Sequence, residues 1–410
     1  MSDLKSNKRQ KHIIVIIFCL IIFCVGYFVV YSFFVSGEAI EYVANNIKSD
    51  DQKTVEEKKV LHIETPDPLK SIYMTQCVVG TKPFRESLVK IVEDTEINSI
   101  IIDIKDYTGK ISFDTTNPKV VDSISDKCGA SDMKEFIEYL HSKNIYVMGR
   151  VAVFQDPHMV NKRPDLAVQS KSTGQMWKDF KGLSFIDVGA KEHWDYIIEI
   201  AKEAYKIGFD EVNFDYVRFP SDGKMDDVEY VHSAGKTKTE ALREFFEYLH
   251  ENLKDTGLKT SVDLFGMTTT SYDDLNIGQL LENTFPYFDY IAPMVYPSHY
   301  PKNFNNWKNP NDHVYEVVHF SMSSAVERAN AFDSLIGSTT PSTDIPLPPP
   351  WYKGGSAKKL RTWIQDFDYG GSYDIPEVKA EIKASLDAGV DSWMVWSPSN
   401  KYTVGALQKE

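Results

Sequence analysis

The sequence predicts a (β/α)8 TIM barrel that follows one amino-terminal transmembrane helix and a stalk. Three observations lead to this prediction. An uncharged apolar run occupies residues 13–35, a polar and acidic stretch covers 36–68, and short β-branched runs then alternate with amphipathic segments of helical period. This alternation is typical of βαβ units that build a parallel sheet. The chain therefore divides into a basic cytoplasmic tail at 1–12, an anchor at 13–35, a stalk at 36–68 and a barrel at 69–410.

The composition excludes several classes of protein. Of the 410 residues, 42% are apolar and 25% are charged, which is typical of a globular protein. The formal net charge of -14 argues against nucleic acid as a partner, because phosphate binding needs clustered Lys and Arg. Four cysteines are too few for a disulfide scaffold. No Cys and His spacing predicts a metal site, and no glycine-rich phosphate loop predicts a nucleotide, so we expect no cofactor.

Residues 13–35 are long enough to cross a membrane as a helix. A rise of about 1.5 Å per residue covers a hydrocarbon core of about 30 Å. Four Lys or Arg residues lie between positions 5 and 11, whereas Glu38 and Glu41 follow the run. Because positive charge beside a span stays in the cytoplasm, we expect a single-pass protein of the cell membrane with an extracytoplasmic barrel. A cleaved signal peptide is the alternative, although its apolar region is usually shorter.

Eight short apolar runs are the expected barrel strands. They lie at 71–77, 98–105, 144–154, 210–219, 259–266, 289–297, 359–367 and 391–397. Helical segments separate them, near 84–95, 131–142, 190–207, 236–254, 275–284, 312–333 and 375–388. Gly208, Gly257 and Gly389 end three helices just before a strand, whereas the loops after strands are long. Long loops at strand carboxyl ends favour a TIM barrel over a doubly wound sheet, and the Gly354-Gly355 pair is interpreted as a turn.

Carboxylates at strand ends are the candidate catalytic groups. Because side chains alternate along a strand, Asp215 on the fourth run and Asp263 on the fifth should both point into the barrel. Two neighbouring carboxylates have pKa values that diverge, which separates an acid from a base. Asp366 on the seventh run is a weaker candidate, since the alternation points it outward. The alternative for each carboxylate is a structural ion pair with Arg or Lys.

Other polar and aromatic residues are candidates for substrate binding. Asp103 and Lys105 should face inward near Arg150, and we interpret this trio as an internal ion network in which Asp103 is also a candidate substrate contact. Arg218 follows Asp215 by three residues and could orient it, bind substrate or pair with an acidic loop residue. Flat rings beside carboxylates suit a sugar, although core packing accounts equally well for about half of the aromatic residues near these loops. The candidates of this kind are Tyr216, Tyr296, His299, Trp363 and Trp396.

Cys77 and Cys128 lie outside the apolar run. The first ends a predicted strand and the second lies in the loop after the next strand, so both belong to the same expected rim. An extracytoplasmic location permits a disulfide, but the sequence does not give the Cα separation that a disulfide requires. A disulfide and two free thiols therefore both remain open.

Four motifs resemble a family of bacterial exported barrel domains classed as putative glycosyl hydrolases. They are FDEVNFDYVRFPSDG at 209–223, SVDLFG at 261–266, DYIAPMVYPSHY at 289–300 and WIQDF at 363–367. The resemblance covers roughly residues 70–405 and implies a TIM barrel related to glycoside hydrolases.

The strand positions of the acids are also similar to those of alpha-amylase-type glycosidases. That similarity implies Asp215 as nucleophile, Asp263 as acid/base and Asp366 as a stabilising carboxylate. This sequence departs from the pattern in two ways. Its fifth-strand acid is Asp instead of the longer Glu, and Arg218 follows the fourth-strand Asp instead of preceding it by two residues.

These inferences together predict a membrane-anchored extracytoplasmic glycoside hydrolase that acts on a cell-wall or exopolysaccharide glycan. A non-catalytic glycan-binding barrel of the cell envelope is the first alternative. A barrel hydrolase of an amide or ester bond is the second, and the sequence supports it little because no metal-binding motif is present.

Overall fold

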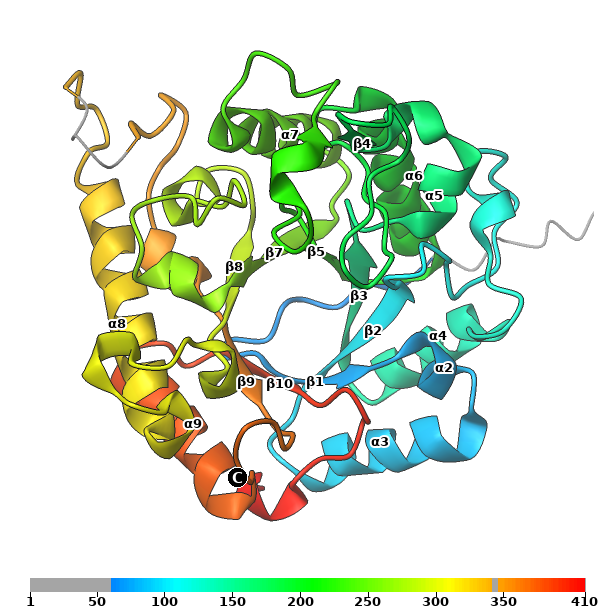
Figure 1. Ribbon diagram of the computed structural model, residues 1–410. Helices are drawn as coiled ribbons and strands as arrows, with labels where there is room; N and C mark the ends of the chain where they lie inside the picture. The colour runs from blue at the N-terminus through cyan, green and yellow to red at the C-terminus, as the bar shows by residue number, and fades with distance from the viewer. Residues whose placement is uncertain (1–59, 341–345, 410) are drawn as a thin grey trace, which may run out of the picture. The chain divides into compact units, whose positions relative to one another are not determined.

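Eight parallel strands close into a barrel in the computed structural model, which describes residues 60–340 and 346–409 (Figure 1). The strands are β1 (Lys70–Met74), β2 (Ser99–Lys105), β3 (Tyr146–Ala152), β5 (Glu211–Asp215), β7 (Lys259–Phe265), β8 (Tyr290–Met294), β9 (Thr362–Gln365) and β10 (Trp393–Trp396). Their order around the barrel is β1-β10-β9-β8-β7-β5-β3-β2. Each strand overlaps one of the eight predicted runs, so the predicted TIM barrel is confirmed.

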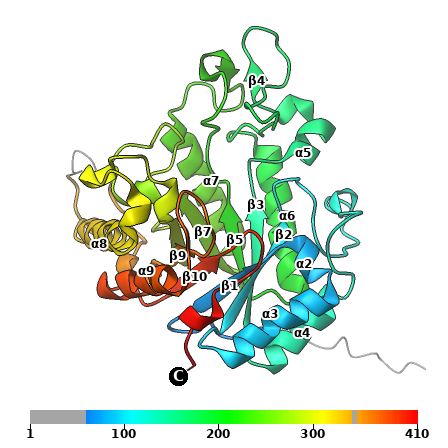
Figure 2. The ribbon, with the colours of Figure 1, turned by 60° about the horizontal axis from the view of Figure 1, so that its bottom comes forward.

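Helices surround the barrel as the periodicity predicts. They are α2 (Gln76–Val79), α3 (Lys82–Asp94), α4 (Met133–Ser142), α5 (Pro157–Lys162), α6 (Lys191–Ile207), α7 (Lys238–Leu253), α8 (Val314–Asp333) and α9 (Ile375–Asp387). A capping box of Thr237 and Glu240 begins α7, and Gly208, with φ of 122°, ends α6 just before β5. Figure 2 shows the helices packed outside the strands, with a two-stranded sheet of β4 (Gln169–Ser170) and β6 (Val228–Glu229) above them.

The prediction of a helix at 275–284 is wrong. Only a short 3₁₀ turn forms, over Leu281–Asn283, and the residues before it include Leu275, Asn276 and Gly278 with positive φ. The Gln279 side chain explains the difference, because it accepts a hydrogen bond from the backbone of β7 and donates one to the backbone after β5. These tertiary contacts hold the segment as a loop on the barrel wall, despite its apolar spacing.

The last residues of the predicted stalk contact the barrel. The backbone N–H of Ile63 donates to Asp210 over 2.9 Å, and the Thr65 hydroxyl donates to Tyr146 over 3.0 Å. Asp210 directly precedes β5 and Tyr146 begins β3, so these contacts lie at the amino-terminal end of the barrel. Residues 60–68 therefore pack beneath the strands.

Two further predictions concern the anchor and the cysteines. The predicted span at 13–35 lies outside the described residues, and within residues 60–340 and 346–409 no helix has the length and apolar character needed to cross a bilayer. Cys77 and Cys128 form a disulfide, with Cα atoms 4.4 Å apart. The disulfide ties the start of α2 to the loop after β2, at the carboxyl-end rim.

Candidate active site

Arg150 of β3 brings three carboxylates together inside the carboxyl end of the barrel. Its Nη1 donates to Asp103 Oδ1 over 2.6 Å, its Nε donates to Asp215 Oδ2 over 3.0 Å, and its Nη2 also donates to Asp215. The same Nε lies 3.8 Å from Asp263 Oδ2. The strand register explains the cluster, since Asp103 is paired with Arg150 across β2 and β3, and Asn213 with Arg150 across β3 and β5.

Asp215 and Asp263 are close enough to interact. Both Oδ2 atoms are neighbours of one Arg150 nitrogen, at 3.0 Å and 3.8 Å, so their separation is at most the sum of these distances, about 6.8 Å. Asp215 ends β5 and is 5% exposed, whereas Asp263 lies within β7 and is 1% exposed. The prediction that the two carboxylates point inward from adjacent strands is confirmed.

The two carboxylates have different environments. Asp263 Oδ1 accepts hydrogen bonds from Asn213 Nδ2 over 2.8 Å and from Trp363 Nε1 over 2.7 Å. Burial, and then the neighbouring Asp215 carboxylate, raise the pKa of Asp263 well above its usual value. Asp215 instead receives two N–H groups of Arg150. The surroundings of Asp263 therefore favour its protonated form.

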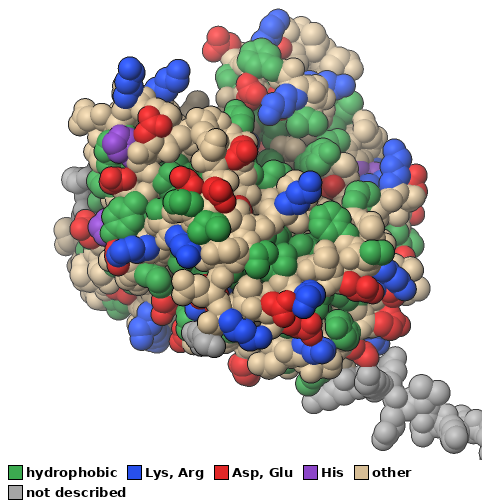
Figure 3. Space-filling view, turned by 90° about the horizontal axis from the view of Figure 1, so that it is seen from below, with side chains coloured by type: hydrophobic (Ala, Val, Ile, Leu, Met, Phe, Trp, Pro, Cys, Tyr) green, Lys and Arg blue, Asp and Glu red, His purple; other side chains and the backbone are tan. Residues whose placement is uncertain are grey.

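A pocket of about 290 Å³ opens above the carboxylates. Its lining residues are Arg150, Asp215, Tyr216, Arg218, Asp263, Phe265, Gln279, Met294, Tyr296, His299, Trp363 and Trp396. The carboxyl-end face lies at the top of Figure 3, where a hollow separates two raised parts of the surface. The buried acids thus border a cavity that is large enough for a sugar unit.

The predicted aromatic residues line this pocket. Tyr296 is 5% exposed, and its hydroxyl has no hydrogen-bond partner in the described part of the chain. Trp396 packs against Arg150, and the guanidinium carbon lies 4.9 Å from the centre of the Trp396 ring. Trp363 donates the hydrogen bond to Asp263. Tyr216 follows β5 with φ of 53°, a left-handed conformation that is rare for a bulky residue, and such outliers cluster at functional sites.

Arg218 does not orient Asp215. Its Nη1 donates to the Phe219 carbonyl over 3.1 Å and to the Ser221 hydroxyl over 3.3 Å, and the guanidinium lies 5.8 Å from the Tyr216 ring centre. The sequence leaves three roles open for Arg218. Its position on the pocket wall is compatible with one of them, substrate binding. Arg150 is the residue that holds Asp215.

Asp366 is not brought together with the other acids. The backbone N–H and hydroxyl of Thr403 both donate to its carboxylate over 2.7 Å, and it does not line the pocket. The strand alternation already directs Asp366 outward, and β9 ends one residue before it, at Gln365. Its carboxylate therefore fixes the carboxyl-terminal loop.

The predicted trio of Asp103, Lys105 and Arg150 is correct only in part. Asp103 pairs with Arg150 and accepts a hydrogen bond from the Tyr73 hydroxyl, so it supports the guanidinium and does not line the pocket. Lys105 pairs with Asp156 over 2.9 Å instead. The cause is a shift of register between β2 and β3 after Asp103, which turns Lys105 away from Arg150.

Sequence reasoning missed three of the lining residues. Phe265 and Met294 end β7 and β8, where strand alternation could have indicated them. Gln279 lies in the segment predicted as a helix, and no sequence signal places it at the pocket.

A closed parallel barrel with two buried carboxylates at its mouth has the architecture that a TIM-barrel glycoside hydrolase requires. Residues 71–402 match the model of the family described as "Putative glycosyl hydrolase domain". The chain therefore belongs to this family, and the resemblance seen in the four motifs is confirmed.

One solved structure shows the same architecture. The chain is similar to the glycoside hydrolase domain of PgaB (BpsB) from Bordetella bronchiseptica, with 12% identity, 83% of this chain and 99% of that chain covered, and a TM-score of 0.57. A hypothetical protein from Ruminiclostridium thermocellum is 33% identical, with 50% of this chain and 98% of that chain covered and a TM-score of 0.43. No curated protein matches the chain. At 12% identity, the likeness to PgaB establishes a shared fold alone.

Proposed function

We propose that this protein is a membrane-anchored extracytoplasmic glycoside hydrolase that acts on a cell-wall or exopolysaccharide glycan. The observation that carries the proposal is the pair of Asp215 and Asp263, two acids in one pocket, of which Asp263 has a raised pKa and Asp215 is held by Arg150. Glycoside hydrolysis needs one carboxylic acid that gives a proton and one carboxylate that remains charged. Family membership and the shared barrel support the glycan as the class of substrate.

The contacts of the two acids suggest their roles. Asp263, whose raised pKa favours its protonated form, gives its proton to the glycosidic oxygen as the bond to the anomeric carbon breaks. Asn213, Trp363 and Arg150 then stabilise the carboxylate that remains. Asp215, oriented by Arg150, faces the positive charge that develops on the sugar.

The separation of the acids bears on the stereochemistry of the reaction. Retaining enzymes hold the two carboxyl groups about 5 to 5.5 Å apart, and inverting enzymes about 6.5 to 9.5 Å apart. The upper limit of about 6.8 Å between the Oδ2 atoms covers the first range and only the lower edge of the second. In the retaining reaction, Asp215 attacks the anomeric carbon, and Asp263 later takes a proton from the water that releases the sugar.

The location rests on two features of the chain. The uncharged run at 13–35, with basic residues before it, supports a membrane anchor with the barrel outside the cytoplasm. The disulfide between Cys77 and Cys128 agrees with this location, because disulfides persist in oxidising compartments.

Incubation of the full-length protein in detergent with purified envelope glycans tests the proposal. New reducing ends should appear with at least one glycan, and Asp215→Asn and Asp263→Asn should each abolish them. Asp222→Asn is the matched control, since Asp222 is exposed in the loop after β5 and does not line the pocket. Hydrolysis that survives both substitutions in the pocket would contradict the assignment.

A non-catalytic glycan-binding barrel is the second candidate. The observation that favours it is the double hydrogen bond from Arg150 to Asp215, because a guanidinium reduces the nucleophilicity of a carboxylate. In that case the protein binds a glycan without releasing reducing ends, and binding survives Asp215→Asn.

A further inference from the structure

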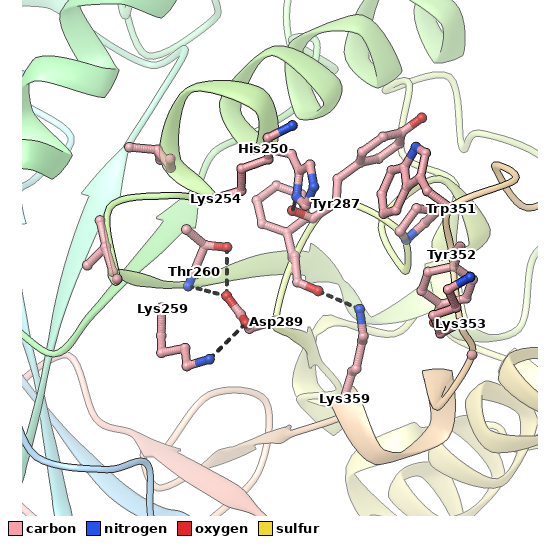
Figure 4. Close-up of a pocket in the computed structure, with 16 residues that line it drawn as sticks. His250, Lys254, Lys259, Thr260, Tyr287, Asp289, Trp351, Tyr352, Lys353 and Lys359 are labelled. Carbon is pink, nitrogen blue, oxygen red and sulfur yellow. Dashed lines mark hydrogen bonds and ion pairs between the residues drawn. The ribbon is translucent and has the colours of Figure 1, made fainter.

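A second cavity lies at the amino-terminal end of the barrel, on the face opposite the catalytic pocket. Its volume is about 390 Å³, and it opens between the end of α7, the beginnings of β7 and β8, and residues 351–354 (Figure 4). None of its lining residues belongs to the pocket above the carboxylates. It is therefore a separate feature of the molecule.

The lining of this cavity is positively charged. The lysines that contribute to it are Lys254, Lys259, Lys353 and Lys359. Among the lining residues, Asp289 is the carboxylate that opposes them, and it is already engaged by the backbone N–H of Thr260 over 2.9 Å and by Lys259 over 3.4 Å. Lys254 pairs with Glu251, just outside the lining. Within the described residues Lys353 and Lys359 form no ion pair, so in a chain with a net charge of -14 the excess positive charge that attracts an anion comes from these two ammonium groups.

Lys359 is the most buried of these ammonium groups. Its Nζ donates to the carbonyl oxygens of Phe285 over 2.6 Å and Phe288 over 2.8 Å. Because an ammonium has three N–H groups, one remains for a ligand. Burial lowers the pKa of Lys359 to about 8, so an anion beside it would restore favourable charge at this position.

Aromatic rings form the other wall of the cavity. Trp351 is 45% exposed and stacks on His250, with ring centres 4.9 Å apart and planes inclined by 11°. Figure 4 places Tyr287, Trp351 and Tyr352 on one side of the cavity, and Lys259, Thr260 and Asp289 on the other. A half-exposed indole offers a flat surface on which the C–H face of a sugar can pack.

The loop that carries Trp351 is held in place. Gly354 and Gly355 have φ of 89° and 86°, which confirms the turn predicted for this pair. Asp333 of α8 accepts hydrogen bonds from the backbone N–H groups of Gly355 and Ser356, over 2.8 Å and 3.0 Å. The aromatic wall is therefore formed before a ligand binds, which reduces the entropy lost on binding.

We propose that this cavity is a second, non-catalytic site that binds an acidic saccharide, a sugar unit bearing a carboxylate. The ring wall would pack on the sugar, and Lys353 and Lys359 would pair with its carboxylate. A neutral sugar would leave these two ammonium groups without an anionic partner, and inorganic phosphate would make no use of the rings. The proposal is independent of hydrolysis at Asp215 and Asp263.

Calorimetric titration of the full-length protein in detergent with tri-galacturonate at low salt tests this site. We expect one binding site, and maltotriose, a neutral trisaccharide, should bind at least tenfold more weakly. Trp351→Ala and Lys353→Glu should each weaken the binding of tri-galacturonate at least tenfold. The controls are Lys202→Glu, a charge reversal at an exposed position of α6, and Arg218→Ala at the opposite mouth, which should both change affinity less than twofold.

Several results would overturn the proposal. Equal weakening by Lys202→Glu and Lys353→Glu would mean a general effect of surface charge, and weakening by Arg218→Ala would place the ligand in the catalytic pocket. Equal binding of maltotriose would remove the role of the lysines. Binding of phosphatidylglycerol vesicles, but not of tri-galacturonate, with the same dependence on Lys353 would identify the site as a lipid contact. None of these measurements depends on enzyme activity, so no outcome among them tests the proposed hydrolysis.

Discussion

Replacing Asp263 with Asn should separate catalysis from stability. An Asn side chain keeps an oxygen that can accept the hydrogen bonds of Asn213 and Trp363, and it has nearly the same shape. The substitution removes the proton that the acid would give. It also removes a buried carboxyl group that lies close to Asp215. We therefore expect activity to fall while the fold is retained.

The magnitudes follow from the contacts of Asp263. Loss of a general acid lowers kcat by about 10²- to 10⁴-fold, or about 3 to 5 kcal/mol in the activation barrier. Stability should change in the opposite direction to activity: near neutral pH the substitution should raise the free energy of unfolding. Because burial raises the folded pKa of Asp263 above its usual value of 3.8, the folded chain keeps a proton that the unfolded chain has lost. The free energy of unfolding is then greatest below the unfolded pKa and falls as pH rises towards and through the folded pKa, by about 1.4 kcal/mol per unit of pKa shift.

Denaturant unfolding of both chains between pH 4 and pH 8, together with reducing-end assays, measures these effects. The stability of the unmodified protein should decline over this range relative to that of the Asp263→Asn chain. Parallel stability curves would mean that the pKa of Asp263 is not raised by folding. Unchanged kcat on a responsive glycan would mean that Asp263 gives no proton to the substrate.

Three other substitutions have definite expected outcomes. Arg150→Met leaves buried carboxylates without a counter-charge and should lower the free energy of unfolding by about 3 to 5 kcal/mol, whereas Arg218→Met at the pocket wall should cost less than about 1 kcal/mol in urea unfolding. Cys77→Ser opens a disulfide that spans 51 residues, which should cost about 4 kcal/mol, and a reductant should lower the melting temperature of the unmodified protein but not of the variant. Tyr296→Phe removes a buried hydroxyl that lacks a partner in the described residues, so stability should not fall; an increase of about tenfold in KM is expected if the hydroxyl binds substrate, and an unchanged KM would exclude that role.

Strand periodicity was sufficient to predict the barrel and the position of its acids. In β5 and β7 the alternation of apolar and polar residues is strong, because one face of each strand meets helices and the other meets the barrel interior. Asp215 and Asp263 follow directly from this alternation. The same reasoning directed Asp366 outward, and its hydrogen bonds to Thr403 agree with that direction.

Long-range contacts account for what the sequence could not predict. Local spacing favours a helix at 275–284, but Gln279 bonds to the backbone of β7 and to the backbone just after β5, and the helix does not form. The partner of Lys105 depends on a shift of register between β2 and β3, which no pattern within either strand reveals. The role of Arg150 likewise arises from three acids on three other strands.

Because no α-helix forms among the described residues between β7 and β8, another part of the chain must contact the segment that joins these two strands. Arg328 of α8 reaches this segment, where it pairs with Glu282 through two hydrogen bonds and donates to the carbonyl oxygens of Thr268 and Ser271. The guanidinium of Arg328 thus holds the segment between β7 and β8, where a helix was predicted to pack. The segment between the two strands is therefore linked to α8, and the amide protons of both should exchange with deuterium as one cooperative unit.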